Sequence, residues 1–228
     1  MRREVTLEEI SDGKLYGAND MVKADCQDCV GCWDCCLGMG ESIVLDPLDV
    51  HRLCVNLGKS MEELLSREIS LGVMDGNILP YLNMTGAEER CVFLNQEGRC
   101  SIHPFRPGIC RLFPLGRFYE ERGHQYFLQV HECKKQNRSK IKVKKWIDVP
   151  DVKRYEAFVN DWHYFLKDVQ EILYQTEDTE KIRDLNLYVV KRFYLMSYDR
   201  EQDFYPQFYE RLGEGKEILE EERAKLHA

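Results

Sequence analysis

A dense cluster of cysteines near the start of the chain is the feature that most limits how it can fold. The stretch DCQDCVGCWDCCLG, residues 25 to 38, places five of the ten cysteines within eleven positions. A Cys-x-x-Cys pair can turn back so that both thiolates face one ion. Overlapping pairs of this spacing therefore favour metal ligation. The five are Cys26, Cys29, Cys32, Cys35 and Cys36.

The rest of the composition indicates a soluble protein of the reducing cytoplasm. The charged start MRREVTLEEISDGK predicts no secretory signal, and no apolar run reaches the roughly 18 residues of a membrane span. In that compartment clustered cysteines indicate metal binding or redox chemistry rather than disulfides. Adjacent Cys35 and Cys36 also cannot easily bridge each other. We therefore expect free thiols that bind metal.

Later segments offer the further ligands that so short a cluster needs. CVFLNQEGRCSIHPFRPGICRLFPLGR contributes three cysteines and HECKK one, whereas Cys54 falls in a helical pattern and is expected to pack as a small core residue. Whether Cys26 binds metal is left open. The predicted metal ligands are Cys29, Cys32, Cys35, Cys36, Cys91, Cys100, Cys110 and Cys133.

These segments together resemble a known family. CVGCWDCC, followed by SIVLDPLDVHRL and GRCSIHPFRPGICRLFP, is similar to the YkgJ-type CxxCxxCC cysteine-cluster family of zinc- or iron-chelating proteins, over roughly residues 26 to 135. The resemblance implies metal or iron–sulfur binding but no defined reaction. Cys26 is extra to the pattern, and His103 stands where many members carry an aromatic residue. Matching residues are Cys29, Cys32, Cys35, Cys36, Cys91, Cys100, Arg106, Pro107, Cys110, Arg111 and Pro114, with Cys133 matching a looser cysteine.

The cysteine-containing half is predicted to be a small α+β unit. Residues 46–58 have Asp46 as a cap and Gly58 as a stop, and residues 60–69 open with Ser60 and Glu63 spaced as a capping box, so both are expected to be helices. CVFLNQEGRCSIH is expected to form a hairpin that brings Cys91 and Cys100 together. GRFYEERGHQYFLQVHE is expected to form a second hairpin, turning near Gly123.

The chain after Pro150 is predicted to be helical. One apolar stripe from Tyr155 to Ile172 recurs at steps of three and four, a second runs from Ile182 to Met196, and a third helix is expected to be interrupted by Gly213 and Gly215. The predicted fold class is thus α+β, mostly α. Residues 1–145 form a metal-binding domain, and residues 146–228 form a helical bundle packed on it.

Charge gives little sign of a nucleic-acid partner. The net charge is −8, and the run KKQNRSKIKVKKW carries seven basic residues. A single basic run in an acidic protein is weak evidence for nucleic-acid binding. We interpret it as a solvated strand or connector, with Ile141, Val143 and Trp146 packing inward.

The identity of the metal remains a choice between two hypotheses. Four thiolates around zinc or a four-iron cluster leave a formal charge near −2, which Arg106, Arg111 and Arg99 could offset, while His131 is a candidate ligand or donor. Tandem short spacings with a remote ligand favour a [4Fe–4S] cluster, used in redox or catalytic chemistry on an unknown substrate. The alternative is a non-enzymatic zinc protein whose metal holds an interaction surface. Whether the chain is an enzyme, its partner and its oligomeric state stay open.

Overall fold

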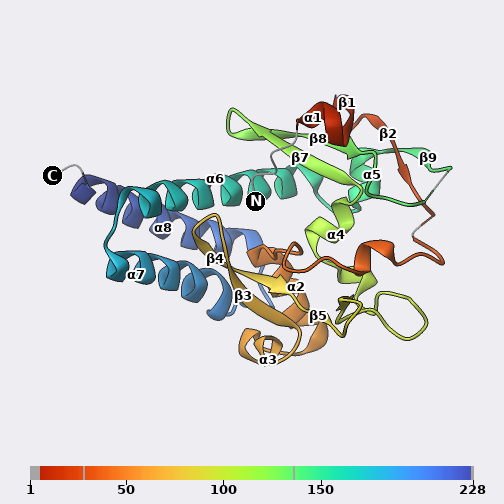
Figure 1. The fold of residues 1–228 in the computed structure, drawn as a ribbon. Helices are drawn as coiled ribbons and strands as arrows, with labels where there is room; N and C mark the ends of the chain where they lie inside the picture. Colours follow the sequence, from red (N-terminus) through yellow and green to blue (C-terminus); the bar gives the residue numbers. More distant parts are fainter. Residues whose placement is uncertain (1–5, 28, 136, 227–228) are drawn as a thin grey trace. The chain divides into compact units, whose positions relative to one another are not determined.

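The chain folds into two compact units, seen in a computed structural model that describes residues 6–27, 29–135 and 137–226 (Figure 1). The first unit comprises Met1–Ile43 and Asn83–Asn160, and the second comprises Val44–Leu82 and Asp161–Ala228. The fold is α+β and mostly helical, as predicted. Nine of the ten cysteines belong to the first unit, and Cys54 belongs to the second. The predicted domain boundary at residue 145 stays a prediction.

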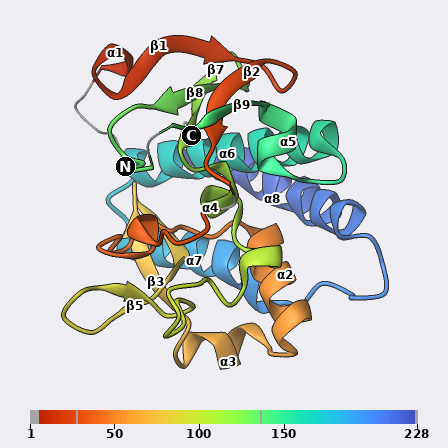
Figure 2. The ribbon, with the colours of Figure 1, turned by 90° about the vertical axis from the view of Figure 1, so that its right-hand side faces the viewer.

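The first unit is built on a three-stranded antiparallel sheet with the strand order β1-β8-β7. Figure 2 shows these strands side by side. Separate two-stranded ladders join β2 to β9 and β5 to β6. Its elements are α1 (Leu7–Ile10), β1 (Ser11–Tyr16), β2 (Met21–Asp25), η1 (Asp34–Cys36), β5 (Met84–Thr85), β6 (Arg90–Cys91), η2 (His103–Phe105), α4 (Gly108–Leu112), β7 (Leu115–Glu120), β8 (Gly123–Gln129), β9 (Ser139–Lys142), α5 (Val143–Ile147) and the start of α6 (Val152–Gln175).

The predicted hairpin near Gly123 is confirmed as β7 and β8. Its two turn residues, Glu121 and Arg122, both have positive φ, at 48° and 62°, which is the conformation of the tight turns that match strand twist. The start of α6 packs against this hairpin. Tyr126 donates to the Glu156 carboxylate at 2.9 Å, and His124 Nδ1 lies 2.6 Å from the Asn160 side-chain oxygen.

The basic run KKQNRSKIKVKKW contains β9 and leads into the short helix α5. This agrees with its interpretation as a solvated strand whose apolar side chains pack inward. Val143 and Trp146 are buried and Ile141 is half-buried. The Trp146 indole donates to the Leu112 carbonyl at 3.2 Å. The lysines of this segment are therefore held on a strand and helix whose apolar side chains face inward.

The second unit combines helices with a two-stranded antiparallel sheet, β3-β4. Both predicted helices at its start are confirmed: Asp46 caps the first, which stops at Gly58 with a left-handed φ of 66°, and Ser60 and Glu63 form a capping box in the second. Its elements are α2 (Pro47–Leu57), α3 (Met61–Leu65), β3 (Ile69–Met74), β4 (Asn77–Leu82), the rest of α6, α7 (Thr179–Val190), the π-helical turn η3 (Lys191–Leu195) and α8 (Phe204–Leu226).

An aromatic core holds the second unit together. The rings of Trp162, Phe165, Phe193 and Phe208 pack at centroid distances of 4.9 to 6.1 Å. Such contacts add to the large area that each aromatic ring removes from water. The predicted stripe from Tyr155 to Ile172 is buried along its whole length.

Two buried polar side chains tie the irregular parts of the second unit to its helices. Asn186 accepts from the Ile78 amide at 2.7 Å and donates to the Gly76 carbonyl at 3.2 Å, which joins α7 to the β3-β4 hairpin. Arg211 donates to the carbonyls of Arg192, Met196 and Ser197. It thereby satisfies carbonyl groups that the end of a helix leaves without partners.

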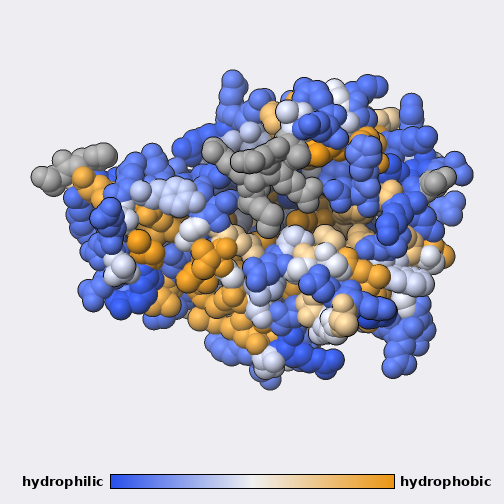
Figure 3. All heavy atoms as spheres, viewed as in Figure 1, coloured by the Kyte–Doolittle hydropathy of each residue, from blue (hydrophilic) through white to orange (hydrophobic). Residues whose placement is uncertain are grey.

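The predicted interruption of the third helix is wrong, because α8 runs unbroken through Gly213 and Gly215. Gly215 is buried, and a methyl group there would lie 2.9 Å from the Phe165 ring. This glycine therefore allows close packing rather than ending the helix. In Figure 3 hydrophobic side chains also gather over β3 and β4, where Leu71 and Val73 are exposed. Within the described residues, none of the helices has the length and apolar composition needed to cross a membrane.

Candidate metal centre

The first cysteine segment folds as a chain of tight turns. The Cys32 amide donates to the Cys29 carbonyl at 3.0 Å, and the Cys36 amide donates to the Trp33 carbonyl at 2.8 Å, where η1 begins. Each turn closes over three residues, which is the spacing of the Cys-x-x-Cys pairs. The spacing therefore returns successive cysteines to one region.

Backbone and ring contacts hold this segment against the second cysteine segment. Leu37 forms an antiparallel bridge with Arg90, next to Cys91, and the Gly38 amide donates to the Glu89 carbonyl at 3.0 Å. A methyl group at Gly98 would lie 2.6 Å from the Trp33 ring, so this ring packs directly on the turn of residues 95–99.

That turn closes the predicted hairpin between Cys91 and Cys100. The Asn95 amide donates to the Arg99 carbonyl at 2.9 Å, and Leu94 pairs with Cys100 in an isolated antiparallel bridge. The connection is hairpin-like, although only an isolated bridge forms where two strands were expected. Burial raises the pKa of the Cys91 thiol, and the nearby Cys100 adds to the rise.

Four half-buried cysteines make up what we call the central group: Cys35, Cys36, Cys91 and Cys100. A hydrogen bond with Cys36, together with burial, raises the pKa of the Cys35 thiol. Burial raises the pKa of Cys91 and of Cys100, and the neighbouring Cys35 adds to both shifts. Because these shifts favour the protonated thiols of Cys35, Cys91 and Cys100, metal binding there would release protons.

Basic side chains lie beside the central group. Arg106 and Arg99 both oppose the rise in the pKa of Cys100, and Arg106 does the same for Cys29. Arg106 Nη1 contacts His103 Nε2, while Arg99 Nη2 lies 3.5 Å from His103 Nδ1. His103 thus contacts two arginine side chains, one through each of its ring nitrogens.

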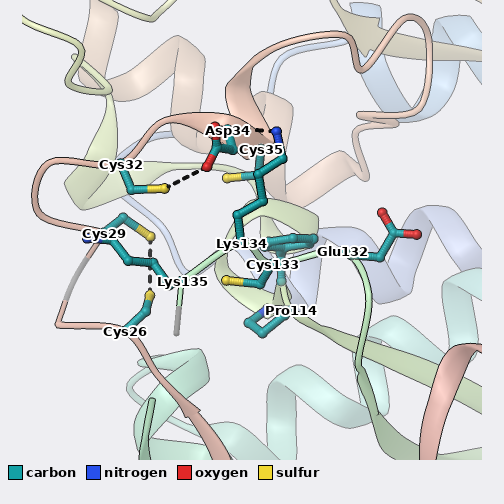
Figure 4. A pocket seen from close by; sticks show the side chains of 11 residues that line it. Cys26, Cys29, Cys32, Asp34, Cys35, Pro114, Glu132, Cys133, Lys134 and Lys135 are labelled. Atoms are coloured by element: carbon teal, nitrogen blue, oxygen red, sulfur yellow. Dashed lines mark hydrogen bonds and ion pairs between the residues drawn. The ribbon is translucent and has the colours of Figure 1, made fainter. Parts of the chain in front are cut away.

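A recess beside the central group gathers further sulfur atoms (Figure 4). Its volume is about 20 Å³, which is room for one water molecule or ion and far below the roughly 300 to 1,000 Å³ of small-molecule pockets. Figure 4 shows the thiols directed toward one another across this space. Its cysteines are Cys26, Cys29, Cys32, Cys35 and Cys133, and its other lining residues are Asp34, Phe113, Pro114, Glu132, Lys134 and Lys135.

The closest contact in the recess is between Cys26 and Cys29, whose Sγ atoms lie 3.4 Å apart. The hydrogen bond with Cys29 lowers the pKa of Cys26 to about 6, and the same bond raises the pKa of Cys29. The two thiols therefore form a single hydrogen bond, in which either sulfur atom can donate. Sequence reasoning left Cys26 open, although its Cys-x-x-Cys spacing to Cys29 was the signal that could have included it.

Two lysines bring the segment of Cys133 to the recess. Lys134 Nζ lies 3.8 Å from Asp34 Oδ1, and Lys135 donates to the Val30 carbonyl at 2.9 Å. The Cys32 thiol in turn donates to Asp34 at 3.3 Å. Sequence analysis did not select Asp34 or these lysines, because nothing in their spacing marks them as neighbours of the cysteines.

Three predicted site residues belong to the first unit but do not line the recess. Arg111 is buried and donates to the carbonyls of Pro104 and Asp148, and Cys110 is half-buried on α4. His131 is exposed and does not line the recess, whereas the adjacent Glu132 does. Their roles at a metal stay predictions.

The donor set fits a thiophilic metal. Within the described residues, no three Cys, His, Asp or Glu side chains already stand in metal-binding geometry. The thiols of the recess nevertheless face one another (Figure 4), and thiolates select zinc, copper(I) and iron–sulfur clusters over hard cations.

Comparison with known proteins agrees with this chemistry. Residues 28–141, half of the chain, match the model of the CxxCxxCC family, which is described as "Putative zinc- or iron-chelating domain". No curated protein and no solved structure matched the chain. The match includes Cys133 and every cysteine of the two cysteine segments except Cys26, and the chain belongs to the CxxCxxCC family.

Proposed function

We propose that the central group holds an iron–sulfur cluster, used in redox or catalytic chemistry on a substrate still to be identified. The observation that carries the proposal is that the Leu37–Arg90 bridge and the packing of the Trp33 ring at Gly98 hold the two cysteine segments together, although more than 50 residues of sequence separate Cys35 from Cys91 and Cys100. Clusters of the [4Fe–4S] type take four cysteine thiolates. Cys36 completes that number.

The surroundings of the central group support a charged cluster. A cluster with four thiolates is anionic, and nearby positive charges and hydrogen bonds tune its reduction potential. Arg99 and Arg106 provide positive charge beside Cys100. Half-burial keeps the thiols within reach of solvent, and a reducing compartment such as the cytoplasm would keep them available for metal. With four cysteines as its ligands, the cluster would supply one-electron transfer.

Zinc is the second candidate, and the hydrogen bond between Cys35 and Cys36 favours it. Two thiols that contact each other can share a single ion, whereas the cysteines of a cluster each bind a different iron. In that case the metal would stabilise the fold of the first unit and its interaction surface, without a reaction of its own.

Anaerobic purification of the full chain tests both candidates. We expect a brown protein that contains iron and sulfide and absorbs near roughly 400 nm. Cys35→Ser should lose this absorption, whereas Cys54→Ser, in the second unit, should retain it. A colourless protein with stoichiometric zinc and no sulfide would replace the cluster with the second candidate. A chain that retains no metal at all would overturn both.

A further inference from the structure

Cys26 lies outside the family match, which begins at residue 28, yet it is the most buried cysteine of the recess. Its exposed fraction is 6%, and the other cysteines of the recess are half-buried. The Cys26 thiol is buried, lies 3.4 Å from Cys29 Sγ and faces further sulfur atoms. This arrangement would suit a metal ligand.

The residues just before Cys26 fix its position in the first unit. It follows directly after β2, whose last residue, Asp25, pairs with Ser139 of β9. The Ser139 hydroxyl donates to Asp25 Oδ2 at 2.8 Å, and the Gln27 amide donates to Asp25 Oδ1 at 2.9 Å. Asp25 therefore fixes both the end of the strand and the turn that follows, so that Cys26 points into the unit.

The backbone around the pair is strained. Gln27 and Cys29 adopt left-handed φ values of 55° and 57°, a conformation that is strained for residues other than glycine. Such conformations persist where the surroundings hold them, and they cluster at ligand sites. Here they direct the Cys29 thiol toward Cys26.

The distance between the two sulfur atoms suits a shared ion. With zinc–sulfur bonds of about 2.3 Å, tetrahedral geometry separates two thiolates by roughly 3.8 Å, close to the 3.4 Å of this pair. Thiolates of a cluster bind different irons and so lie farther apart. Cys32 and Cys133 line the same recess, whose volume fits one ion, and their thiolates would bring the number of sulfur ligands to four. Cys35 faces this space too, but its hydrogen bond joins it to Cys36.

The charge of the recess also suits such an ion. Four thiolates around a divalent cation carry a formal charge of about −2. Lys134 and Lys135 both line the recess, and their contacts with Asp34 and Val30 hold them beside it. The two lysine ammonium groups therefore lie beside the site, where their positive charge can offset the negative charge of the thiolates.

We propose that Cys26, Cys29, Cys32 and Cys133 form a mononuclear thiolate site for a soft divalent cation of the zinc type, separate from the central group. This site is independent of the metal assigned to the central group under the proposed function. The chain would therefore bind two metals, and Cys26 would extend the site beyond the residues of the family match.

Cysteine alkylation of the full wild-type chain, read by mass spectrometry, tests the site without any substitution. With Zn²⁺ present, Cys26, Cys29, Cys32 and Cys133 should react at least about ten-fold more slowly than after chelation, because metal-bound thiolates are shielded. If Cys26 reacts at the same rate with and without Zn²⁺, the site does not exist. Cys91 and Cys100 report on the central group in the same spectra, so either proposal can fail while the other stands.

Zinc content gives the second measurement. Cys26→Ser should lose one zinc per chain and keep the metal of the central group, whereas Cys54→Ser should lose none. Cys26→Ser with full zinc content would overturn the proposal, as would protection of all cysteines by a single equivalent of Zn²⁺. Should Cys26→Ser fail to fold, the wild-type alkylation pattern decides alone.

Discussion

The two units of this chain rely on different interactions. The second unit has a core of packed aromatic rings, and two of its buried polar side chains, Asn186 and Arg211, form hydrogen bonds with backbone groups. The first unit has a sheet of its own, but its cysteine segments are short turns linked by an isolated bridge, a few hydrogen bonds and one indole ring. Apolar packing is thus sufficient to stabilise the second unit. The cysteine turns of the first unit have few stabilising contacts apart from those that their thiols could form with a metal.

This difference predicts where metal matters. Turns with few buried apolar contacts open at low cost in free energy, and a metal that joins distant segments supplies the missing constraint by closing long loops. The cysteine segments should therefore depend on metal for their order. The aromatic core should not.

The largest effect is expected for Cys100→Ser. Because Cys100 belongs to the second segment and interacts with Cys35, its loss should remove most of the metal of the central group and speed amide exchange in residues 29–36. Metal analysis combined with hydrogen exchange measures both. The matched control is Cys54→Ser, which should change neither. Full metal content and unchanged exchange in Cys100→Ser would show that the two segments do not share a metal.

A pair of glycine substitutions tests the aromatic core of the second unit. In Gly215→Ala the new methyl group would meet the buried Phe165 ring, so we expect a loss of about 1 to 3 kcal/mol in the free energy of unfolding. Gly213→Ala, two residues away, meets no atom within 4 Å and should gain roughly 0.5 to 1 kcal/mol from helix propensity. Denaturant unfolding measures both, and metal content should stay unchanged. Equal effects of the two substitutions would contradict the packing assigned to Gly215.

The smallest effect concerns pH and the sheet of the first unit. Burial lowers the pKa of His124 to about 4, from about 6.5 in an unfolded chain. Above about pH 6.5 the His124 imidazole is neutral in both the folded and the unfolded chain, so it adds no pH dependence to stability there. Between about pH 6.5 and about pH 4, His124 takes up a proton only in the unfolded chain, so the free energy of unfolding falls as the pH falls.

The measurement is thermal unfolding between about pH 7 and about pH 4.5, for wild type and His124→Gln. Removing the titrating group should make the variant less sensitive to acid than the wild type. Identical pH profiles for the two proteins would show that His124 is not buried in its neutral form.

The sequence predicted those parts of the fold that depend on local signals. Asp46 and Gly58 mark the ends of α2, and the steps of three and four in α6 mark a buried face, because capping and periodicity act within a few residues. The prediction that Gly213 and Gly215 interrupt the third helix was wrong. The ring that packs against Gly215 belongs to Phe165, 50 residues earlier in the chain, and no local pattern reveals that contact.

At the candidate site, spacing identified most cysteines but not their neighbours. The pairing of Leu37 with Arg90 and the contact of Lys134 with Asp34 join distant segments, and no local pattern encodes them. Cys26 was left open because it is extra to the family pattern, although its spacing to Cys29 matches the other pairs. Its burial and its contact with Cys29 appear only in the fold.

Hydrogen exchange on the full chain, with metal bound and after chelation, tests the central claim most directly. Removing the metal should speed exchange at least about ten-fold for the amides of Cys32, Cys36 and Gly38, which close the turns of the first segment. The amides of α7 and α8 in the second unit should keep their rates. Unchanged exchange in residues 29–38, or an equal increase in both units, would contradict the account.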